Sequence, residues 1–412
     1  MNKFNKLIKS INSRFAKFNN TELENVLNVL NNNKRLDYVK KLEGLFSKKF
    51  KVKYSIACNS GTSGLHSALA ALDLKKGDEV IVPGLTVVMD AYAALHLDAT
   101  PVFADVDKDT FLITAKTIRP KITKKTKAII VVSLQGLPVD IDPILKIAKK
   151  KNIYVIEDNA QDMLGSYKKR ISGRSADIGV WSFENKKHLS GATEGGMISA
   201  NNKYLAEKIR KFAGIGYKNM TATGGRTSLA ISTVQDPDYE RFDTVGLNYR
   251  MPQIVAAVCY AQLKSVNKIV NKRRKVAKYF SEAIKDSKIL IEQYTPKNTK
   301  HTHYTFAVKL VDNRKVKWKQ LYNMYKSKTG DGFYGACVCP HLEPSIKSHL
   351  NKVGCIKCNW NKNKCFCTKK GYLPIAEKIQ KQIIQFKTNY RDLNLAKKNS
   401  KILKIILNKI DS

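Results

Sequence analysis

The sequence has no long uninterrupted apolar run. Its apolar stretches, such as 128–134, are far shorter than the roughly 20 residues that a helix needs to cross a bilayer. Residues 1–17 alternate Lys and Asn with apolar side chains, and they lack the unbroken apolar core and small-residue cleavage site of a signal peptide. We therefore expect a cytoplasmic protein without membrane contact.

Acidic residues are also scarce, with 34 Asp and Glu against 74 Lys and Arg, and the formal net charge is +40. This charge suggests either a nucleic-acid surface or a compositional bias towards Lys that enriches the solvated surface. The lysines are spread along the chain, and no nucleic-acid module with interleaved aromatics is present. We favour the compositional explanation and expect no nucleic-acid partner, although the charge would concentrate an anionic substrate.

Cysteine is limited to eight residues, and six of them fall between positions 337 and 367. Cys58 and Cys259 have apolar or small neighbours typical of packed thiols. The other six form close pairs, which are Cys337-x-Cys339, Cys355-x2-Cys358 and Cys365-x-Cys367. Such pairs can bind zinc. Free thiols are the commoner outcome at these spacings, so we assign no metal.

The pattern of apolar residues indicates an α/β protein with two domains. Short apolar strands alternate with helical stretches between residues 53 and about 200, which favours a mostly parallel sheet flanked by helices. The expected strands are 54–58, 79–82, 101–104, 128–134 and 154–157, and the expected helices are 62–72, 90–97 and 142–151. The chain length allows a large domain and a smaller one.

We place a helical N-terminal segment at 1–52, a large α/β domain at 53–285 and a small C-terminal α+β domain at 286–412. Thr21 and Glu24 have the spacing of a capping box at the start of the first helix. Residues 250–285 are predicted to form one long helix. A strand at 305–310 and amphipathic helices make up the C-terminal part.

Three separated segments carry residues suited to chemistry. Asn59–Gly64 links a strand to a helix with small residues, so its amides and hydroxyls could bind a phosphate, although such loops are usually plain turns. Asp158 ends an apolar strand, where ligands sit in open parallel sheets, but a lone Asp there is more often a helix cap. Lys187 lies 29 residues further on, next to Lys186. In so basic a chain this lysine pair is by default a solvated one.

Taken together, the ordered segments resemble the DegT/DnrJ/EryC1/StrS aminotransferases, which are pyridoxal 5′-phosphate (PLP) enzymes of fold type I that act mainly on nucleotide-linked keto-sugars. The resemblance runs from about residue 35 to the C-terminus. Its segments are Ser60–His66, Val155–Gln161, Asp177–Leu189 with Glu194–Gly196, and Asn248–Met251.

The resemblance implies a role for each matching residue. Gly61, Thr62, Ser63 and Ser182 would hold the PLP phosphate, Asp158 would pair with the pyridine nitrogen, and Gln161 would lie against the ring. Lys187 would bind PLP as a Schiff base and act as general acid and base, since it follows Ser182 by five residues, whereas Lys186 is out of register. Asn248 would reach the active site of a partner subunit, which implies a homodimer with shared sites.

Two departures from the family pattern stand out. The turn Ser190–Gly196 is one residue longer than usual, and Val87 stands where an aromatic often stacks on the cofactor ring. His341 and Glu343 lie in a region that resembles a substrate-facing loop. A branch of the family that dehydrates sugars carries His instead of the lysine, so Lys187 favours transamination.

The resulting expectation is an aminotransferase that moves an amino group from glutamate or glutamine to a keto-sugar, most simply a nucleotide-linked one used in cell-surface polysaccharide or deoxyaminosugar synthesis. Ping-pong kinetics should follow. The alternatives are transamination of a keto-cyclitol, sugar dehydration, and a non-catalytic basic binding protein on a PLP-enzyme scaffold.

Overall fold

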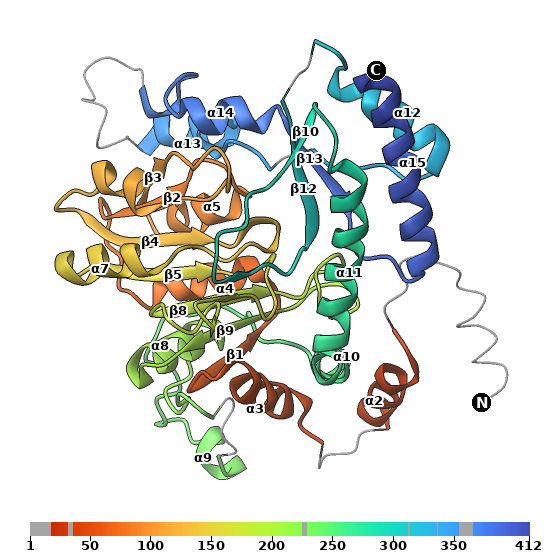
Figure 1. The fold of residues 1–412 in the computed structure, drawn as a ribbon. Helices are drawn as coiled ribbons and strands as arrows, with labels where there is room; N and C mark the ends of the chain where they lie inside the picture. The colour runs from red at the N-terminus through yellow and green to blue at the C-terminus, as the bar shows by residue number, and fades with distance from the viewer. Residues whose placement is uncertain (1–17, 32–35, 225–228, 312–313, 336, 354–365) are drawn as a thin grey trace.

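The computed structural model describes residues 18–31, 36–224, 229–311, 314–335, 337–353 and 366–412. Its centre is a seven-stranded sheet in the order β1-β9-β8-β5-β4-β2-β3 (Figure 1). The strands are β1 (Tyr54–Cys58), β2 (Glu79–Pro83), β3 (Thr100–Ala104), β4 (Thr126–Val132), β5 (Tyr154–Asp158), β8 (Ile178–Ser182) and β9 (Gly196–Ala200).

Strand direction brings the predicted site segments to one edge of this sheet. Strands β3, β2, β4, β5 and β8 pair in parallel, and β9 runs antiparallel to both β8 and β1. Strand β1 therefore points the same way as β8. The carboxyl ends of β1, β2, β4, β5 and β8 meet at the same edge, where ligands bind in sheets of this kind. The α/β fold with a mostly parallel sheet is as the sequence predicts.

Helices surround the sheet. Those of the N-terminal half are α2 (Asn20–Leu30), α3 (Tyr38–Phe50), α4 (Gly61–Ala70), α5 (Met89–Leu95), α6 (Ala115–Ile118), α7 (Asp142–Lys151), α8 (Lys203–Ala213) and α9 (Ile231–Gln235). The bounds of α4, α5 and α7 agree with the predicted segments to within two residues, whereas α6, α8 and α9 were not predicted. Short 3-10 turns follow at η1 (Arg119–Lys121) and η2 (Leu134–Gly136). Among the described residues, no helix combines the length and apolar character needed to cross a membrane.

A second, antiparallel sheet holds the C-terminal part. Its order is β10-β12-β13 (Leu290–Glu292, Thr305–Leu310, Ile383–Lys387), and α11, α12 and α15 lie on its side away from the large sheet (Figure 1). A small third sheet joins β11 (Thr299–Lys300) to β6 (Ser166–Tyr167) and β7 (Arg170–Ile171). The remaining elements are α10 (Gln253–Lys264), α11 (Val266–Ile284), α12 (Trp318–Thr329), η3 (Pro340–Leu342), α13 (Pro344–Val353), η5 (Phe366–Thr368), α14 (Pro374–Gln380) and α15 (Leu393–Asp411).

Residues after 286 contribute to two cores. Phe306, Phe386 and Leu403 pack in the core of the small sheet, whereas Ile346 and Leu373 join the core of the large sheet. The segment that carries η3, α13 and α14 therefore packs on the large sheet. The predicted domain boundary at residue 286 therefore stays a prediction.

Two local predictions were wrong. Residues 250–285 do not form one helix, because α10 ends at Lys264 and α11 begins at Val266, and the backbone of Ser265 between them leaves the helical region (φ −97°, ψ 5°). The capping box of α2 is made by Asn19 and Glu22, not by Thr21 and Glu24. Asn is at least as favourable an N-cap residue as Thr, so the helix begins two residues earlier, with Asn19 as its N-cap.

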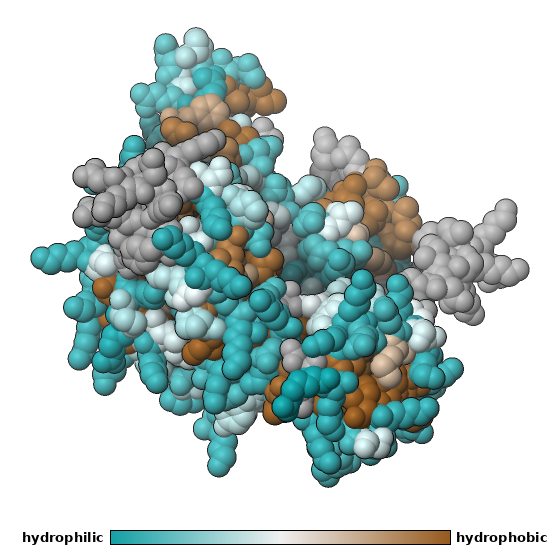
Figure 2. Space-filling model, turned by 90° about the horizontal axis from the view of Figure 1, so that it is seen from above, coloured by the Kyte–Doolittle hydropathy of each residue, from teal (hydrophilic) through white to brown (hydrophobic). Residues whose placement is uncertain are grey.

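The surface carries many hydrophilic side chains, and the compositional explanation of the charge stays a prediction. On the face seen in Figure 2, hydrophilic side chains predominate and apolar ones form separate patches.

Candidate active site

The loop after β1 is shaped by a capping box at the start of α4. The Ser60 hydroxyl accepts a hydrogen bond from the Ser63 amide (3.0 Å), and the Ser63 hydroxyl accepts one from the Ser60 amide (3.1 Å) and donates to the Ser60 carbonyl (2.9 Å). The Ser63 hydroxyl is thus already engaged in the loop. The leading amides of Gly61 and Thr62 have no carbonyl within the helix to bond, so they face an anion-binding position.

Gly61 brings this loop against the end of β8. A Cβ atom at position 61 would lie only 2.8 Å from the Cβ atom of Ser182. The predicted phosphate loop and Ser182 therefore touch, although 121 residues separate them. The Thr62 side chain is exposed, whereas Ser63 and Ser182 are buried.

Asp158 ends β5 and is fully buried between neighbouring strands. Its backbone pairs with Val132 of β4 and Val180 of β8, and its carboxylate accepts a hydrogen bond from the Ala160 amide (2.8 Å). Burial raises the pKa of Asp158, while the Ala160 amide and the Lys187 ammonium both act in the opposite direction. The electrostatic influence of Lys187 shows that these two predicted residues lie in one site.

Lys187 lies in the loop between β8 and β9, and hydrogen bonds hold its own backbone carbonyl and that of Lys186. The Arg273 guanidinium donates to the carbonyls of Lys186 and Lys187 (both 3.0 Å) and to that of Tyr304 (2.7 Å). The Lys187 Nζ atom is 4.9 Å from the centre of the Tyr304 ring. Burial lowers the pKa of the Lys187 amine, against the carboxylates of Asp158 and Glu184, which favours the neutral amine. The Lys186 side chain, in contrast, is exposed.

Gln161 is held beneath the same edge. Its side-chain oxygen accepts a hydrogen bond from the Gln135 amide (2.7 Å), and its side chain also interacts with the Cys337 thiol. Burial raises the pKa of Cys337 to about 11, with Lys187 acting in the opposite direction. Cys337 thus lies near the lysine, which the spacing of the cysteines alone did not predict.

Asp90 is a buried acid that the sequence analysis missed. It lies in the first turn of α5, accepts a hydrogen bond from the Thr86 hydroxyl (2.7 Å) and is hydrogen-bonded to Asp158. Burial raises the pKa of Asp90 well above its ordinary value, and the charge of Asp158 raises it further. The only signal in the sequence was an Asp in an otherwise apolar helix start.

Asn248 lies apart from these residues. It is exposed, forms an isolated antiparallel β-bridge with Gly214, and accepts a hydrogen bond from the Arg250 side chain (3.0 Å). The next residue, Tyr249, accepts a hydrogen bond from the Asn59 amide (2.8 Å), so this arm runs beside the phosphate loop. Strongly exposed apolar side chains surround Asn248 in the chain, namely Ile231, Phe242, Val245, Leu247 and Ile254.

Two further predicted features have other environments. His341 is fully buried, bonds Glu377 (3.0 Å) and packs near Phe103, so its side chain does not face an open site. In the part of the chain that the structure describes, no group of three His, Cys, Asp or Glu side chains is arranged to hold a metal ion. Cys355, Cys358 and Cys365 lie outside the described residues.

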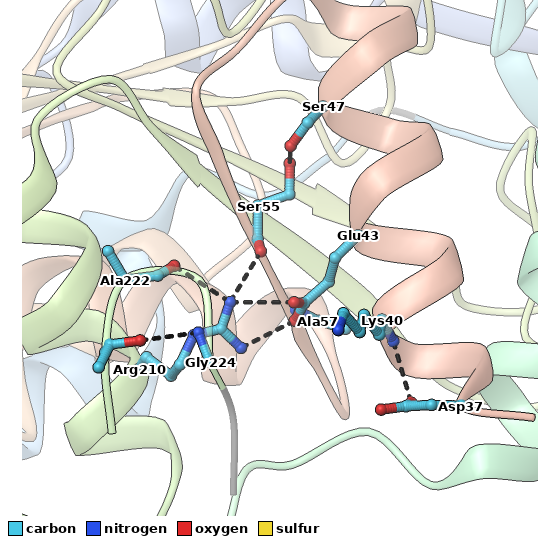
Figure 3. Close-up of polar contacts among 10 residues, drawn as sticks. Asp37, Lys40, Glu43, Ser47, Ser55, Ala57, Arg210, Ala222 and Gly224 are labelled. Atoms are coloured by element: carbon cyan, nitrogen blue, oxygen red, sulfur yellow. Dashed lines mark hydrogen bonds and ion pairs between the residues drawn. The ribbon is translucent and has the colours of Figure 1, made fainter. Parts of the chain in front are cut away.

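An ion pair fastens the strand that leads into the phosphate loop. Arg210 of α8 donates two hydrogen bonds to Glu43 of α3 (3.0 and 2.9 Å), and Glu43 also accepts from the Ala57 amide of β1 (Figure 3). Arg210 further bonds the Ser55 carbonyl. The pair lines a cavity of about 360 Å³ that also contains Arg250 and Gln253.

Known proteins are similar to this chain in both sequence and fold. A profile described as the DegT/DnrJ/EryC1/StrS aminotransferase family matches residues 16–334. A GDP-perosamine synthase from Escherichia coli is 35% identical over 272 residues, which are 66% of this chain and 69% of that protein. One from Caulobacter vibrioides is 37% identical over 248 residues, 60% and 62% of the two chains.

Solved structures extend the likeness to nearly the whole chain. An aminotransferase from Psychrobacter cryohalolentis matches with a TM-score of 0.82 and 26% identity, over 97% of this chain and all of that one. The E. coli GDP-4-keto-6-deoxy-D-mannose-3-dehydratase, solved with hydrated PLP bound, has a TM-score of 0.80 and 23% identity, over 95% and 97% of the chains, which shows the shared fold.

Proposed function

The chain belongs to the DegT/DnrJ/EryC1/StrS aminotransferase family of PLP-dependent enzymes, and on this premise we propose that it transfers an amino group from glutamate or glutamine to a nucleotide-linked keto-sugar. The observation that carries the proposal is the meeting of Asp158, Lys187 and the Gly61 loop at one sheet edge. Asp158 and Lys187 are its catalytic residues.

The residues present fit PLP. The leading amides of α4 suit a phosphate, and the close approach of Gly61 to Ser182 leaves room there only for a residue without a side chain. Ser182 and the exposed Thr62 hydroxyl add donors, while Ser63 contributes through the shape of the loop. Asp158 suits the ring nitrogen, and Gln161 suits the ring and its hydroxyl.

When bound, PLP supplies an aldehyde that takes up the amino group and a ring that accepts negative charge. Lys187 then moves the proton at the amine-bearing carbon of the donor, which requires a neutral amine and therefore gains from its lowered pKa. Asp158 keeps the ring nitrogen protonated. Arg273 fixes the backbone that carries Lys187, and the Tyr304 ring lies beside its amine, so both restrict where the amine can go.

The preference for a nucleotide-linked sugar rests on the relatives. The two GDP-perosamine synthases make a GDP-linked sugar the first candidate, and the net charge of +40 favours an anionic substrate. The environment of His188 argues against sugar dehydration by a histidine, since its ring is buried against the Thr302 carbonyl (3.2 Å).

A panel of nucleotide-linked keto-sugars tests this proposal, with glutamate and glutamine as donors. We expect an aminated sugar with at least one GDP-linked keto-sugar, together with ping-pong kinetics. A chain that binds PLP but aminates only a free keto-cyclitol would contradict the nucleotide-sugar assignment. A chain that binds no PLP would contradict the whole proposal.

The proposal includes a homodimer in which Asn248 completes the partner's site. Ile231, Phe242 and Val245 are 81%, 52% and 96% exposed, and several strongly exposed apolar side chains in one stretch of the chain suit an interface. A shared site of this kind makes the two-fold symmetric dimer the working unit.

Val245→Lys tests the dimer, with Ile291→Lys, on the exposed edge of β10, as the matched control. The fold should keep its stability within about 0.5 kcal/mol in both variants, because both positions are exposed. We expect Val245→Lys to sediment as a monomer and to bind PLP more weakly, and Ile291→Lys to behave as the parent protein. A dimeric Val245→Lys variant would argue against this interface.

A further inference from the structure

Asp90 is the acid in this site that the family's residue pattern does not assign. Its side chain is completely buried in the first turn of α5, and it faces Asp158 at the end of β5. One oxygen, Oδ2, accepts the Thr86 hydroxyl (2.7 Å). The other, Oδ1, receives no hydrogen bond from a donor group among the described residues.

Two carboxylates this close in a buried site do not both stay ionised, because their repulsion is hardly screened. Asp158 is better placed to keep the negative charge, since it accepts the Ala160 amide and feels the Lys187 ammonium. Asp90 has only the Thr86 hydroxyl, and the Cys337 thiol nearby brings no positive charge. These contacts favour Asp90 as the member of the pair that carries the shared proton.

We propose that Asp90 is a neutral carboxylic acid that donates a hydrogen bond from Oδ1 to Asp158 and thereby positions Asp158, as an anion, for the pyridine nitrogen of PLP. The inference rests on the proposed function of the site. It accounts for both oxygens of Asp90, since Oδ2 is then the carbonyl oxygen that accepts from Thr86 and Oδ1 is the hydroxyl. A hydrogen bond to a carboxylate stabilises its charged form, so Asp158 remains ionised although it is buried.

Asparagine and leucine at position 90 separate this role from the alternatives. Asp90→Asn keeps the shape of the neutral acid, with an amide oxygen for Thr86 and an amide nitrogen that donates to Asp158. Asp90→Leu fills similar space without a donor. If Asp90 acted instead through a negative charge, the two substitutions would be equally harmful.

The first experiment measures PLP affinity by titrating the apoprotein, and the steady-state kcat and KM of the loaded enzyme. We expect Asp90→Asn to stay within about threefold of the parent protein and Asp90→Leu to bind PLP about tenfold or more weakly, as loss of a hydrogen bond to a charged group implies. The loss should appear mainly in kcat rather than in the KM of the sugar. Equal weakening in both variants, or no weakening in Asp90→Leu, would overturn the proposal.

A second measurement keeps the test valid if the leucine variant does not fold. The infrared difference spectrum between the parent and Asp90→Asn apoproteins at neutral pH should contain a protonated-carboxyl band that belongs to the parent protein. A difference spectrum without that band would overturn the proposal. These outcomes differ from failure of the proposed function, in which the parent protein itself binds no PLP.

Discussion

Two groups of buried acids in this protein are balanced in opposite ways. Glu43 meets Arg210 through two hydrogen bonds, and the pair fastens β1 between α3 and α8. Asp90 and Asp158 face each other, and the cation that acts on Asp158 is Lys187 in a separate loop. The first arrangement satisfies its charges within the fold, whereas the second leaves one proton to be shared.

The difference separates a structural role from a functional one. A largely buried ion pair with two hydrogen bonds between its partners holds elements together, and breaking it by removing one partner is costly. Acid facing acid contributes nothing comparable to folding, and strongly shifted pKa values of this kind cluster at functional sites. Substitutions in the Glu43 pair should therefore alter stability, and those around Asp158 should alter chemistry.

The largest expected effect is on chemistry. Lys187→Ala should lower transamination by about a thousandfold or more, because the general acid and base is lost. Borohydride treatment after incubation with PLP should no longer label a peptide spanning residues 183–195. Lys186→Ala is the matched control and should keep both labelling and activity. Labelling at Lys186 would place the reactive amine one residue earlier than the sequence register indicates.

Arg210→Met should have its effect on stability instead. It leaves the Glu43 carboxylate buried without its partner, so the free energy of unfolding in urea should fall by about 3–5 kcal/mol. The double variant Glu43→Leu/Arg210→Met should recover part of this loss, since no charge then remains unpaired. Folded Arg210→Met protein should still bind PLP at Lys187. Unchanged stability of the single variant would remove the contrast between the two acid groups.

His303 makes the stability of the protein depend on pH. The rings of His301 and His303 stack at 3.8 Å, and burial, with a further contribution from Arg274, lowers the pKa of His303 to about 4. Its stabilising effect is complete above the unfolded value of about 6.5 and is lost as the pH falls towards 4.

At pH 5 this histidine should cost up to about 2 kcal/mol relative to pH 7.5. His303→Phe keeps the stacked ring, and the Nδ1 atom that it removes has no hydrogen-bond partner among the described residues. The variant should therefore lose less stability between pH 7.5 and pH 5 than the parent protein. Equal losses in urea unfolding would show that His303 does not titrate in this range.

Gly61→Ala should weaken PLP binding or folding by about 1–3 kcal/mol, because its Cβ atom would crowd Ser182. Gly44→Ala is a matched control, since a Cβ atom there meets nothing within 4 Å. Comparison of the two variants shows whether the phosphate loop acts on PLP binding, like Asp158, or on stability, like the Glu43–Arg210 pair. PLP titration and urea unfolding of both variants answer this.

Local patterns predicted the first five strands and α7 well. Their apolar runs are short and bounded by polar turns, and α7 has the predicted bounds of Asp142–Lys151. Strands β8 and β9 were not predicted, because Ile178–Ser182 and Gly196–Ala200 merge into the segments that carry the lysine and the glycines. Helical periodicity continues across Ser265, so the pattern of apolar residues gives no sign of the break between α10 and α11.

The linear segments identified Asp158 and Lys187, whose meeting depends on strand order. Asp90 could not be found in the same way, because its partner is 68 residues away and becomes adjacent only when α5 and β5 share one sheet edge. Tyr304 and Arg273 come from the C-terminal half and reach Lys187 only through tertiary packing.

The loop that carries Lys187 also explains how the chain accommodates its longer turn. Its ends are tied by hydrogen bonds from the Phe183 amide to the Gly195 carbonyl (2.7 Å) and from the Gly191 amide to the Phe183 carbonyl (2.8 Å). The additional residue that the resemblance implies would fall in the return arm, after the lysine, and would leave the spacing from Ser182 to Lys187 unchanged. Divergence of this enzyme family can therefore lengthen or shorten that arm without disturbing the reactive amine, and insertions there should be inherited more freely than insertions before the lysine.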